Sequence, residues 1–296
     1  MKGKIAYVVA DLEGSTGAWT KAHTLLGPEW QEARVELTRD INAAAEALFE
    51  RNVKGVVVKD FHRTEYNLLP SYLDKRVKLV SGYYNGPAVG YGKLYGADFA
   101  LFVGLHASGG NERGFLAHTL TSRIAEIRVN GKRICESELF ATVLSAFRVP
   151  VVFFSGCPAA CQEIKERMNW VVTYAIPKDP LVYQDADKRI GYIAGMRKGL
   201  GEKIKEIPDP EGLPLFVLKP PFDCQVTFQE EAEARRMNAW GFPQDGRVIC
   251  FHAEEFLELY QNLLKIAYFP KLAYTLRNLV IPLTRVVWKI QSLKHL

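Results

Sequence analysis

Short apolar runs alternate with segments of helical periodicity along the first half of the chain. An apolar run over residues 4–10 is followed by a helical pattern that opens at Pro28 and stops near Asn52, and a second apolar run starts at Gly55. A strand, a helix and a strand within about sixty residues are typical of a βαβ unit, whose parallel strands are covered on both faces. Later apolar runs predict further strands at 77–82, 99–104 and 149–154.

The same alternation continues through the second half of the chain. A hairpin is predicted over 124–135, because Asn130-Gly131 is a typical type I′ turn. Helices are predicted at 140–147, 158–168, 186–207, 230–240 and 254–268, and strands at 170–175, 215–218, 225–228 and 248–251. The sequence therefore predicts an α/β fold with a largely parallel or mixed sheet and helices on both faces. We divide it into a first α/β domain over 1–157, a smaller second α/β domain over 158–268, and a C-terminal helical tail over 269–296.

The tail combines an apolar stripe with positive charge. Six Lys or Arg residues and no acidic residue lie between Leu259 and Leu296, which leaves 32 basic and 33 acidic residues in the rest of the chain. The stripe predicts an amphipathic helix that Pro282 should kink. Contact with a membrane surface or a partner is one interpretation, but packing on its own or a neighbouring subunit explains most such stripes and is favoured. The stripe consists of Leu272, Leu276, Leu279, Leu283, Val287 and Ile290.

The composition is that of an ordinary globular protein and argues against some classes of function. Of the 296 residues, 48% are hydrophobic and 24% are charged, and the tail carries the net charge of +5. A nucleic-acid-binding surface is not indicated, because the body of the chain is close to neutral. No signal peptide or membrane-spanning run is evident, and five sparse cysteines suggest reduced thiols, so a cytoplasmic location is expected.

Two carboxylates follow the first predicted strand. Asp11 and Glu13 stand two residues apart, and side chains at i and i+2 of an extended chain point to the same face. Two acids aimed at one point repel each other, so a positive charge is expected between them. Acids at a strand end also occur in ordinary exposed loops, and for this pair alone that interpretation is the commoner one.

Other predicted elements also end on residue types that bind metals. His62 follows the second strand, His106 follows the fourth, and Glu136 comes just after the hairpin. The carboxyl ends of strands in open α/β sheets are where ligands bind. Glu138 is a rival to Glu136, because both would leave the hairpin on the same face. The candidate metal ligands are Asp11, Glu13, His62, His106 and Glu136.

This set of two histidines and three carboxylates suits Zn²⁺, and also Mn²⁺, Co²⁺ or Fe²⁺. Five ligands exceed the three that one catalytic zinc takes, so a pair of ions about 3.5–4 Å apart, bridged by a carboxylate, is predicted. Such a pair activates water and polarises a carbonyl or phosphoryl group. His118, across a glycine-rich loop from His106, could transfer a proton or stabilise the oxyanion. Asp60 could orient His62.

The remaining histidines and the cysteines carry no site prediction. A lone histidine is more often a surface or core residue than a ligand, which applies to His23, His252 and His295. Cys157 and Cys161 are one helical turn apart, but two thiols do not complete a zinc site.

Several motifs occur together in a specific order and spacing. Residues 9–17 read Val-Ala-Asp-Leu-Glu-Gly-Ser-Thr-Gly, and later motifs are Asp60-Phe61-His62 with Asn67-Leu68, Gly104-Leu105-His106-Ala107 and Asn130-Gly131…Cys135-Glu136. Together they resemble the zinc-dependent D-aminopeptidase family associated with dipeptide-transport operons, a family of self-compartmentalising metallopeptidases. The resemblance is strong over about residues 5–156 and weaker to about residue 268.

This resemblance implies a dinuclear zinc site with two ions per subunit and with His118 as the catalytic histidine, acting either as a nucleophile or as an acid/base. It also implies two-domain subunits assembled into a decamer of two pentameric rings, with active sites that face an inner chamber. The expected reaction is the release of N-terminal D-amino acids from short peptides. The implied ligand roles are a bridging Asp11, one ion on Glu13 and His62, and the other ion on His106 and Glu136.

The leading functional hypothesis is a dinuclear-metal aminopeptidase or amidohydrolase, acting by metal-hydroxide attack on the peptide carbonyl. Two alternatives stay open at this point. The same ion pair would suit a metallo-phosphoesterase. A catalytically silent, metal-stabilised binding or scaffold subunit would keep the ligands without turnover.

Overall fold

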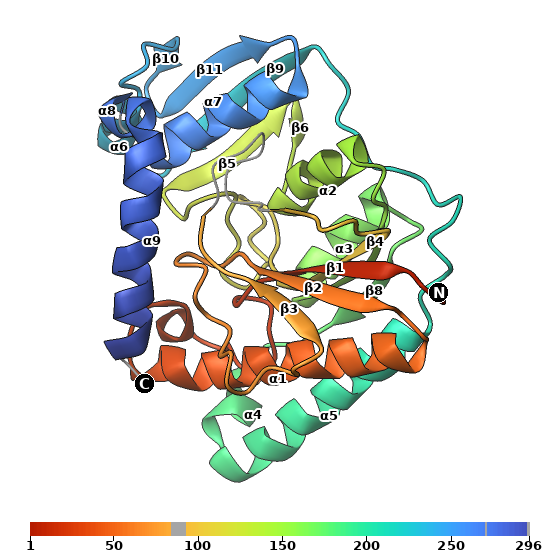
Figure 1. The fold of residues 1–296 in the computed structure, drawn as a ribbon. Helices are drawn as coiled ribbons and strands as arrows, with labels where there is room; N and C mark the ends of the chain where they lie inside the picture. Colours follow the sequence, from red (N-terminus) through yellow and green to blue (C-terminus); the bar gives the residue numbers. More distant parts are fainter. Residues whose placement is uncertain (84–92, 270, 295–296) are drawn as a thin grey trace.

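The computed structural model describes residues 1–83, 93–269 and 271–294, and its centre is a parallel sheet (Figure 1). Within the described residues this sheet has six strands in the order β3-β2-β1-β4-β7-β8, and every neighbouring pair is parallel. The strands are β1 (Ile5–Ala10), β2 (Gly55–Asp60), β3 (Val77–Val80), β4 (Phe99–Leu105), β7 (Val151–Gly156) and β8 (Val172–Ala175).

Helices cover both faces of this sheet, as the sequence predicted. On one face, α1 (Pro28–Glu50) and α5 (Ala186–Lys205) pack on alternate strand residues such as Val8. On the other face, α2 (Glu136–Ala146) and α3 (Pro158–Arg167) pack on the strand residues of opposite parity. Because alternate side chains of a strand point to opposite faces, both sets must be apolar when both faces are covered. The predicted α/β class is confirmed.

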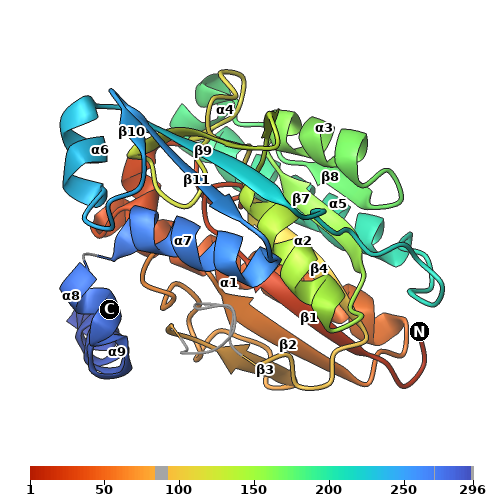
Figure 2. The ribbon, with the colours of Figure 1, turned by 90° about the horizontal axis from the view of Figure 1, so that it is seen from above.

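A second, antiparallel sheet lies above the first in Figure 1, and Figure 2 shows it from above. Its strand order among the described residues is β10-β11-β9-β5-β6. Apolar residues of α6 (Glu231–Met237) and α7 (Phe256–Tyr268) pack in the core that it shares with the first sheet. The strands are β5 (Ile124–Val129), β6 (Lys132–Arg133), β9 (Phe222–Phe228), β10 (Gln244–Asp245) and β11 (Val248–Ala253).

Each sheet takes strands from both sides of residue 157. β5 and β6 precede this position but belong to the antiparallel sheet, whereas β8 follows it and pairs with β7 in the parallel sheet. The division of the chain into domains stays a prediction, and the two sheets interleave along the sequence.

One predicted strand, at 215–218, does not form. Side chains of α2 satisfy this backbone instead: Thr142 Oγ1 accepts a hydrogen bond from Leu218 N at 3.2 Å, and Ser145 Oγ donates to the Phe216 carbonyl at 2.8 Å. The helix predicted at 140–147 starts earlier, at Glu136. Two short helices were not predicted, η1 (Lys21–Thr24) and α4 (Pro180–Gln184).

The tail forms α8 (Lys271–Thr275) and α9 (Arg277–Lys294), and the inner face of α9 packs on the chain itself. Ile281 is buried, and the Ser292 carbonyl accepts a hydrogen bond from Arg34 Nη1 of α1 at 3.2 Å. In Figure 1, α9 runs from the level of the second sheet to the start of α1. None of the helices in the described residues is both long and apolar enough to cross a membrane.

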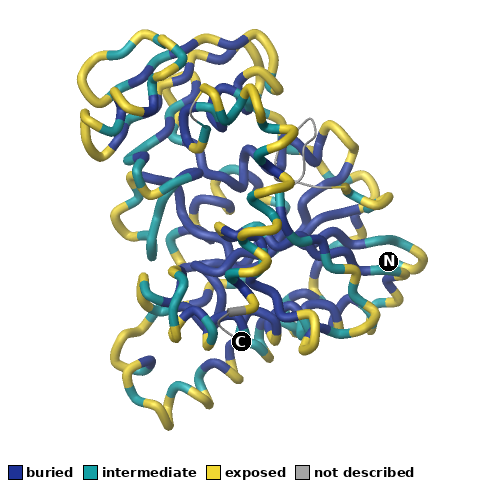
Figure 3. Tube along the Cα trace, turned by 60° about the vertical axis from the view of Figure 1, so that its left-hand side comes forward, coloured by how far each residue is buried: buried dark blue, intermediate teal, exposed yellow. Residues whose placement is uncertain are grey.

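The side chains of the apolar stripe lie on the opposite side of the helix and are exposed. In Figure 3, exposed residues recur along the tail helix that runs toward the C label. Its large side chains are 44% to 71% exposed and follow one another at alternating spacings of four and three residues. Packing on the chain's own subunit, one of the two favoured arrangements, therefore does not account for this stripe. The predicted stripe contained Val287, which is exposed as well, whereas Val286 and Leu293 keep the alternating spacing. We call the set with this spacing the tail seam, and it consists of Leu272, Leu276, Leu279, Leu283, Val286, Ile290 and Leu293.

The junction of β1 and β4 leaves no room for side chains at two glycines. Gly104 has a φ of +80°, and a Cβ there would clash with the Asp11 carbonyl oxygen. A Cβ on Gly14 would clash with the Leu105 carbonyl oxygen. This approach lets Gly14 N donate to the Gly104 carbonyl at 2.7 Å. The glycines therefore fix the turn that carries Asp11 against the strand that leads to His106.

We expect Gly104→Ala to lower the free energy of unfolding by about 1–3 kcal/mol or more, because alanine strains the left-handed backbone and meets the facing carbonyl. Gly195→Ala is the matched control. Gly195 lies inside α5 with open space at its Cβ position, so alanine should stabilise by about 0.4–1 kcal/mol. Urea denaturation of the metal-free proteins measures both changes, and equal effects at the two positions would contradict the tight junction.

Candidate metal centre

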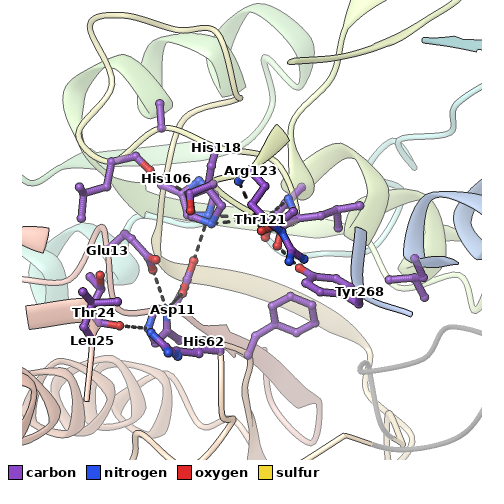
Figure 4. A pocket seen from close by; sticks show the side chains of 18 of the residues that line it. Asp11, Glu13, Thr24, Leu25, His62, His106, His118, Thr121, Arg123 and Tyr268 are labelled. Atoms are coloured by element: carbon purple, nitrogen blue, oxygen red, sulfur yellow. Dashed lines mark hydrogen bonds and ion pairs between the residues drawn. The ribbon is translucent and has the colours of Figure 1, made fainter. Parts of the chain in front are cut away.

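The candidate residues meet at the carboxyl edge of the parallel sheet, where the strand order reverses. β1 lies between β2 and β4, so the chain moves from β1 to one side for β2 and β3 and returns on the other side at β4. Ligands bind at such switch points in open α/β sheets. Asp11 and Glu13 follow β1, His62 follows β2, and His106 follows β4 (Figure 4).

Asp11, Glu13 and His62 form one cluster of buried side chains. His62 Nδ1 lies 2.8 Å from Glu13 Oε2 and 3.3 Å from Asp11 Oδ1. One ligand atom from each residue lies within 4.8 Å of the other two. An imidazole and two carboxylates that converge in this way are a ligand set for zinc and similar divalent ions.

His106, His118 and Glu136 form a second cluster with the same 4.8 Å spread of ligand atoms. Glu136 Oε1 lies 3.7 Å from His106 Nε2 and 4.0 Å from His118 Nε2. The two imidazole rings are stacked, with centroids 3.9 Å apart and an interplanar angle of 13°. The six residues singled out in the sequence thus lie in two neighbouring groups.

Backbone carbonyl groups orient the three imidazole rings. In a neutral ring, a nitrogen that donates to a carbonyl leaves the other nitrogen with a lone pair. Here that second nitrogen faces a carboxylate oxygen in each case, which is repulsive unless the ring takes up a proton or a cation lies between the two groups. This set of donor atoms fits a metal centre, and so do the backbone carbonyls that hold the imidazole rings through their other nitrogen. The orienting bonds run from His62 Nε2 to Thr24 (3.0 Å), His106 Nδ1 to Ala107 (3.1 Å) and His118 Nδ1 to Leu116 (2.8 Å).

The electrostatics of the metal-free clusters favour added positive charge. Burial and the nearby Glu13 raise the pKa of Asp11, and burial raises the pKa of Glu136 to about 7. Burial also acts to raise the pKa of Glu13, but the imidazoles, His62 above all, hold it well below its usual value. His62 is buried too, and its pKa is nevertheless well above the usual value because of the carboxylates. Bound cations would stabilise all three carboxylates in their charged form.

Comparison with known proteins identifies the family. A model of the peptidase family M55, described as D-aminopeptidase, matches residues 4–264. The chain belongs to this family. Its fold is similar to that of the Zn-dependent D-aminopeptidase DppA from Bacillus subtilis, a self-compartmentalizing protease, with a TM-score of 0.71 and 21% sequence identity over 88% of this chain and 96% of that chain. No match is found among curated proteins.

Membership of the D-aminopeptidase family confirms the resemblance drawn from the motifs. It makes the chain a member of a peptidase family, which favours amide hydrolysis over the phosphoesterase alternative. The likeness to DppA, at 21% identity, shows the fold and confirms the predicted architecture.

In this family member, both clusters open into one cavity of about 1010 Å³. That volume lies near the upper end of the range for small-ligand sites, so a short peptide fits and a folded protein does not. The C-terminal tail forms part of the wall, although it lies beyond the matched family segment. The tail residues that line the cavity include Ala273, Val280, Ile281, Thr284 and Trp288.

Asp60 has a different role from the one expected. Its carboxylate does not contact the His62 ring but accepts hydrogen bonds from Asn67 N at 2.5 Å and Leu68 N at 2.8 Å. Asn67 Nδ2 in turn donates to the His62 carbonyl at 2.7 Å. Asp60 therefore fixes the backbone of the loop that carries His62, whereas the Thr24 carbonyl orients the ring.

Glu138 is not a metal ligand candidate in the structure. It contacts Arg167 Nη1 at 2.8 Å and accepts a hydrogen bond from Cys135 N at 2.9 Å. Because α2 begins at Glu136, residues two apart point to different sides of a helix with 3.6 residues per turn. The expectation that both glutamates share one face was wrong, and Glu136 is the one that faces the cavity.

Several cavity residues carried no signal in the sequence. Tyr83, Arg123 and Tyr268 line the cavity but come from separate segments, and each is a lone residue of a common type. Only their position beside the clusters distinguishes them, and that position depends on long-range pairing.

The other histidines and the thiols match the ordinary interpretation. His23 is buried, its ring centroid lies 3.8 Å from that of Trp19, and a hydrogen bond of 2.8 Å joins its Nδ1 to Thr20 Oγ1. His252 is exposed, and His295 lies outside the described residues. All five cysteines are free thiols.

His23 should make the stability of the protein depend on pH. Burial lowers its pKa from 6.5 to about 4, so between these values the unfolded chain binds a proton that the native chain does not. The free energy of unfolding therefore falls as the pH falls through this window. The glutamine in His23→Gln does not titrate, so this variant lacks the effect. We expect the difference in free energy of unfolding between wild type and His23→Gln to become smaller from pH 7 to pH 4. Urea denaturation with a chelator present measures it. A difference that stays constant over this range would contradict the assignment.

Proposed function

We propose that this D-aminopeptidase family member is a dinuclear zinc aminopeptidase that releases N-terminal, D-configured amino acids from short peptides. The observation that carries the proposal is the position of Asp11. Its Oδ1 lies 3.3 Å from His62 Nδ1 in one cluster, and its Oδ2 lies 3.5 Å from His106 Nε2 in the other. A carboxylate that faces two ligand sets is suited to bridge two ions.

In this proposal each cluster holds one ion. Glu13 and His62 would hold the first, His106 and Glu136 the second, and Asp11 would bridge them. Zinc bound there supplies a Lewis acid for the peptide carbonyl and lowers the pKa of water. Mn²⁺, Co²⁺ and Fe²⁺ suit the same nitrogen and oxygen ligands.

His118 is the proposed catalytic residue. Its side chain is 16% exposed, against 3% for His106, so it meets the cavity more openly than the proposed ligand does. Nδ1 donates to the Leu116 carbonyl, which leaves Nε2 to take a proton or to pass one to the leaving amine. Glu136, 4.0 Å away, stabilises the protonated ring.

The substrate assignment combines the cavity with the comparisons. The family description and the name of DppA both specify D-aminopeptidase, and we extend this specificity to the present chain. The cavity of about 1010 Å³ and its buried polar floor fit a short peptide with its amide at the two clusters. A cytoplasmic location, expected from the free thiols, stays a prediction.

Metal analysis and kinetics of two variants test the site. We expect wild type to bind two zinc ions per chain, to lose activity with a chelator and to regain it with zinc. Asp11→Ala should lose both zinc and activity, because both clusters lose a ligand. His118→Ala should keep two zinc ions while kcat falls by about 10²–10⁴-fold.

His252→Ala, at an exposed histidine outside the cavity, is the control and should change neither zinc content nor kcat. The substrate panel compares D-Ala-D-Ala with its L counterpart and with phosphodiesters. Full zinc and full activity in Asp11→Ala would refute the dinuclear site. Loss of one zinc ion in His118→Ala would make that histidine a ligand.

We also propose that copies of the chain assemble into a homo-oligomer, a decamer of two pentameric rings. DppA is described as self-compartmentalizing, which supports assembly. The tail seam supports it independently, because apolar residues at alternating spacings of three and four are the pattern with which one helix packs on another. We therefore assign the tail seam to a contact with a second copy rather than to a membrane.

The double variant Leu279→Glu/Leu283→Glu should lower the molar mass of the assembly measured by light scattering, because it places charges in the middle of the tail seam. Leu181→Glu is the matched control, since Leu181 is exposed on α4, outside the tail. An unchanged mass in the double variant would exclude the tail seam from the contacts between copies.

A further inference from the structure

Arg123 is a cation in the cavity wall with few partners of its own. It directly precedes β5, and its carbonyl accepts a hydrogen bond from Gln229 N at 2.8 Å. Its Nη2 donates to the Ala267 carbonyl near the end of α7 at 2.7 Å. Its Nε is buried without an acceptor among the described residues, and none of their carboxylates pairs with the guanidinium. A guanidinium has five N–H donors, so most of its bonding capacity is unused.

Hydrogen bonds fix the Arg123 segment relative to the metal centre. Leu120 N donates to Glu136 Oε1 at 2.5 Å, and the Tyr268 hydroxyl donates to the Leu120 carbonyl. Figure 4 places Arg123, Thr121 and Tyr268 together in the cavity beside the clustered imidazoles. The guanidinium is therefore held close to the proposed reaction site by the same backbone that holds Glu136.

The charge of Arg123 is unusual for its surroundings. The cavity floor carries the carboxylates of Asp11, Glu13 and Glu136, which repel an anionic ligand group. Lys21 and Arg63 also line the cavity but are exposed, so solvent and salt screen them. A half-buried guanidinium with unused donors is the better anion anchor, because it presents a fork that matches a carboxylate.

We propose that Arg123 binds the C-terminal carboxylate of the peptide substrate, an inference that rests on the proposed aminopeptidase function. In a dipeptide or a tripeptide, one or two residues separate the first peptide bond from the C-terminal carboxylate. Each extended residue spans about 3.3–3.6 Å. Because Arg123 lines the same cavity as the two clusters and its segment bonds Glu136, such an anchor would favour short peptides, whose carboxylate stays inside that cavity. Arg123 is thus a residue that determines length and end-group specificity.

The test compares D-Ala-D-Ala with its C-terminal amide, which has the same shape but no negative charge. For wild type with zinc, we expect kcat/KM to be about 10–100-fold higher for the acid, mainly through KM. Arg123→Gln should lose this preference, because kcat/KM should fall for the acid and stay unchanged for the amide. Arg123→Lys should keep part of the preference, because lysine retains the positive charge but lacks the fork of donors. Arg63→Gln, at the exposed arginine of the same cavity, is the matched control and should keep the preference.

Equal cleavage of acid and amide by wild type would overturn the role of Arg123 and leave the aminopeptidase proposal intact. An equal loss for both peptides in Arg123→Gln, with zinc content unchanged, would also overturn it and indicate a structural role. If wild type cleaves neither peptide, the proposed function fails. Calorimetry then measures the affinity of zinc-loaded His118→Ala for both peptides, which tests Arg123 without turnover. The inference requires that His118→Ala binds the acid more tightly than the amide, and that the double variant His118→Ala/Arg123→Gln binds both equally.

Discussion

The burial of like charges at one edge of a parallel sheet is the constraint on which the rest of this structure depends. Asp11, Glu13 and Glu136 are almost inaccessible to water, and their ion-pair partners among the described residues are imidazoles. The carboxylates raise the pKa of His62, but one imidazolium does not offset three carboxylates in a site of low dielectric constant. Cations that bound these clusters only in the folded chain would therefore stabilise it, and metal binding would then be coupled to folding.

The same constraint explains why the surroundings of the centre are so firmly held. If one candidate ligand moved away, its neighbours would face an uncompensated charge. Each segment that carries a candidate ligand has its own polar anchor. Two glycines lock the β1 turn to β4, and Asp60 holds the loop after β2 through Asn67 and Leu68. The start of α2, which carries Glu136, is fixed by the contact between Glu138 and Arg167. These polar anchors lie behind the ligands and leave the cavity side free for substrate.

Much of the centre could be predicted from the sequence because it depends on local properties. An apolar run defines a strand, the residue after the run lies at the strand end, and parity places Asp11 and Glu13 on one face. Of the two glutamates, Glu136 lies with His106 and His118, because α2 begins at Glu136 and turns Glu138 to another side of the helix. The apolar pattern at 215–218 predicted a strand that does not form. Hydroxyl groups of α2 bond this backbone instead of a neighbouring strand.

What could not be predicted depends on pairing between distant segments. The antiparallel sheet joins 124–129 to 222–228, and this register brings Arg123 to the cavity. A single arginine before a strand gives no sign of such a position. The helical period of the tail was also local and was predicted, but which side of the helix meets the body depends on contacts such as that between Arg34 and Ser292.

The tail connects the metal centre with the proposed assembly. Ile281 and Trp288 on its inner side form part of the cavity wall, whereas the tail seam on its outer side exposes large apolar residues. In the proposed assembly, a neighbouring copy that covers the tail seam would pack on the same helix whose inner side lines the cavity. The family match covers residues 4–264, and this helix lies beyond it. If a peptide binds Arg123 as proposed, the cavity wall and the position of this cation would together limit its length, and both depend on the packing of α7 and α9.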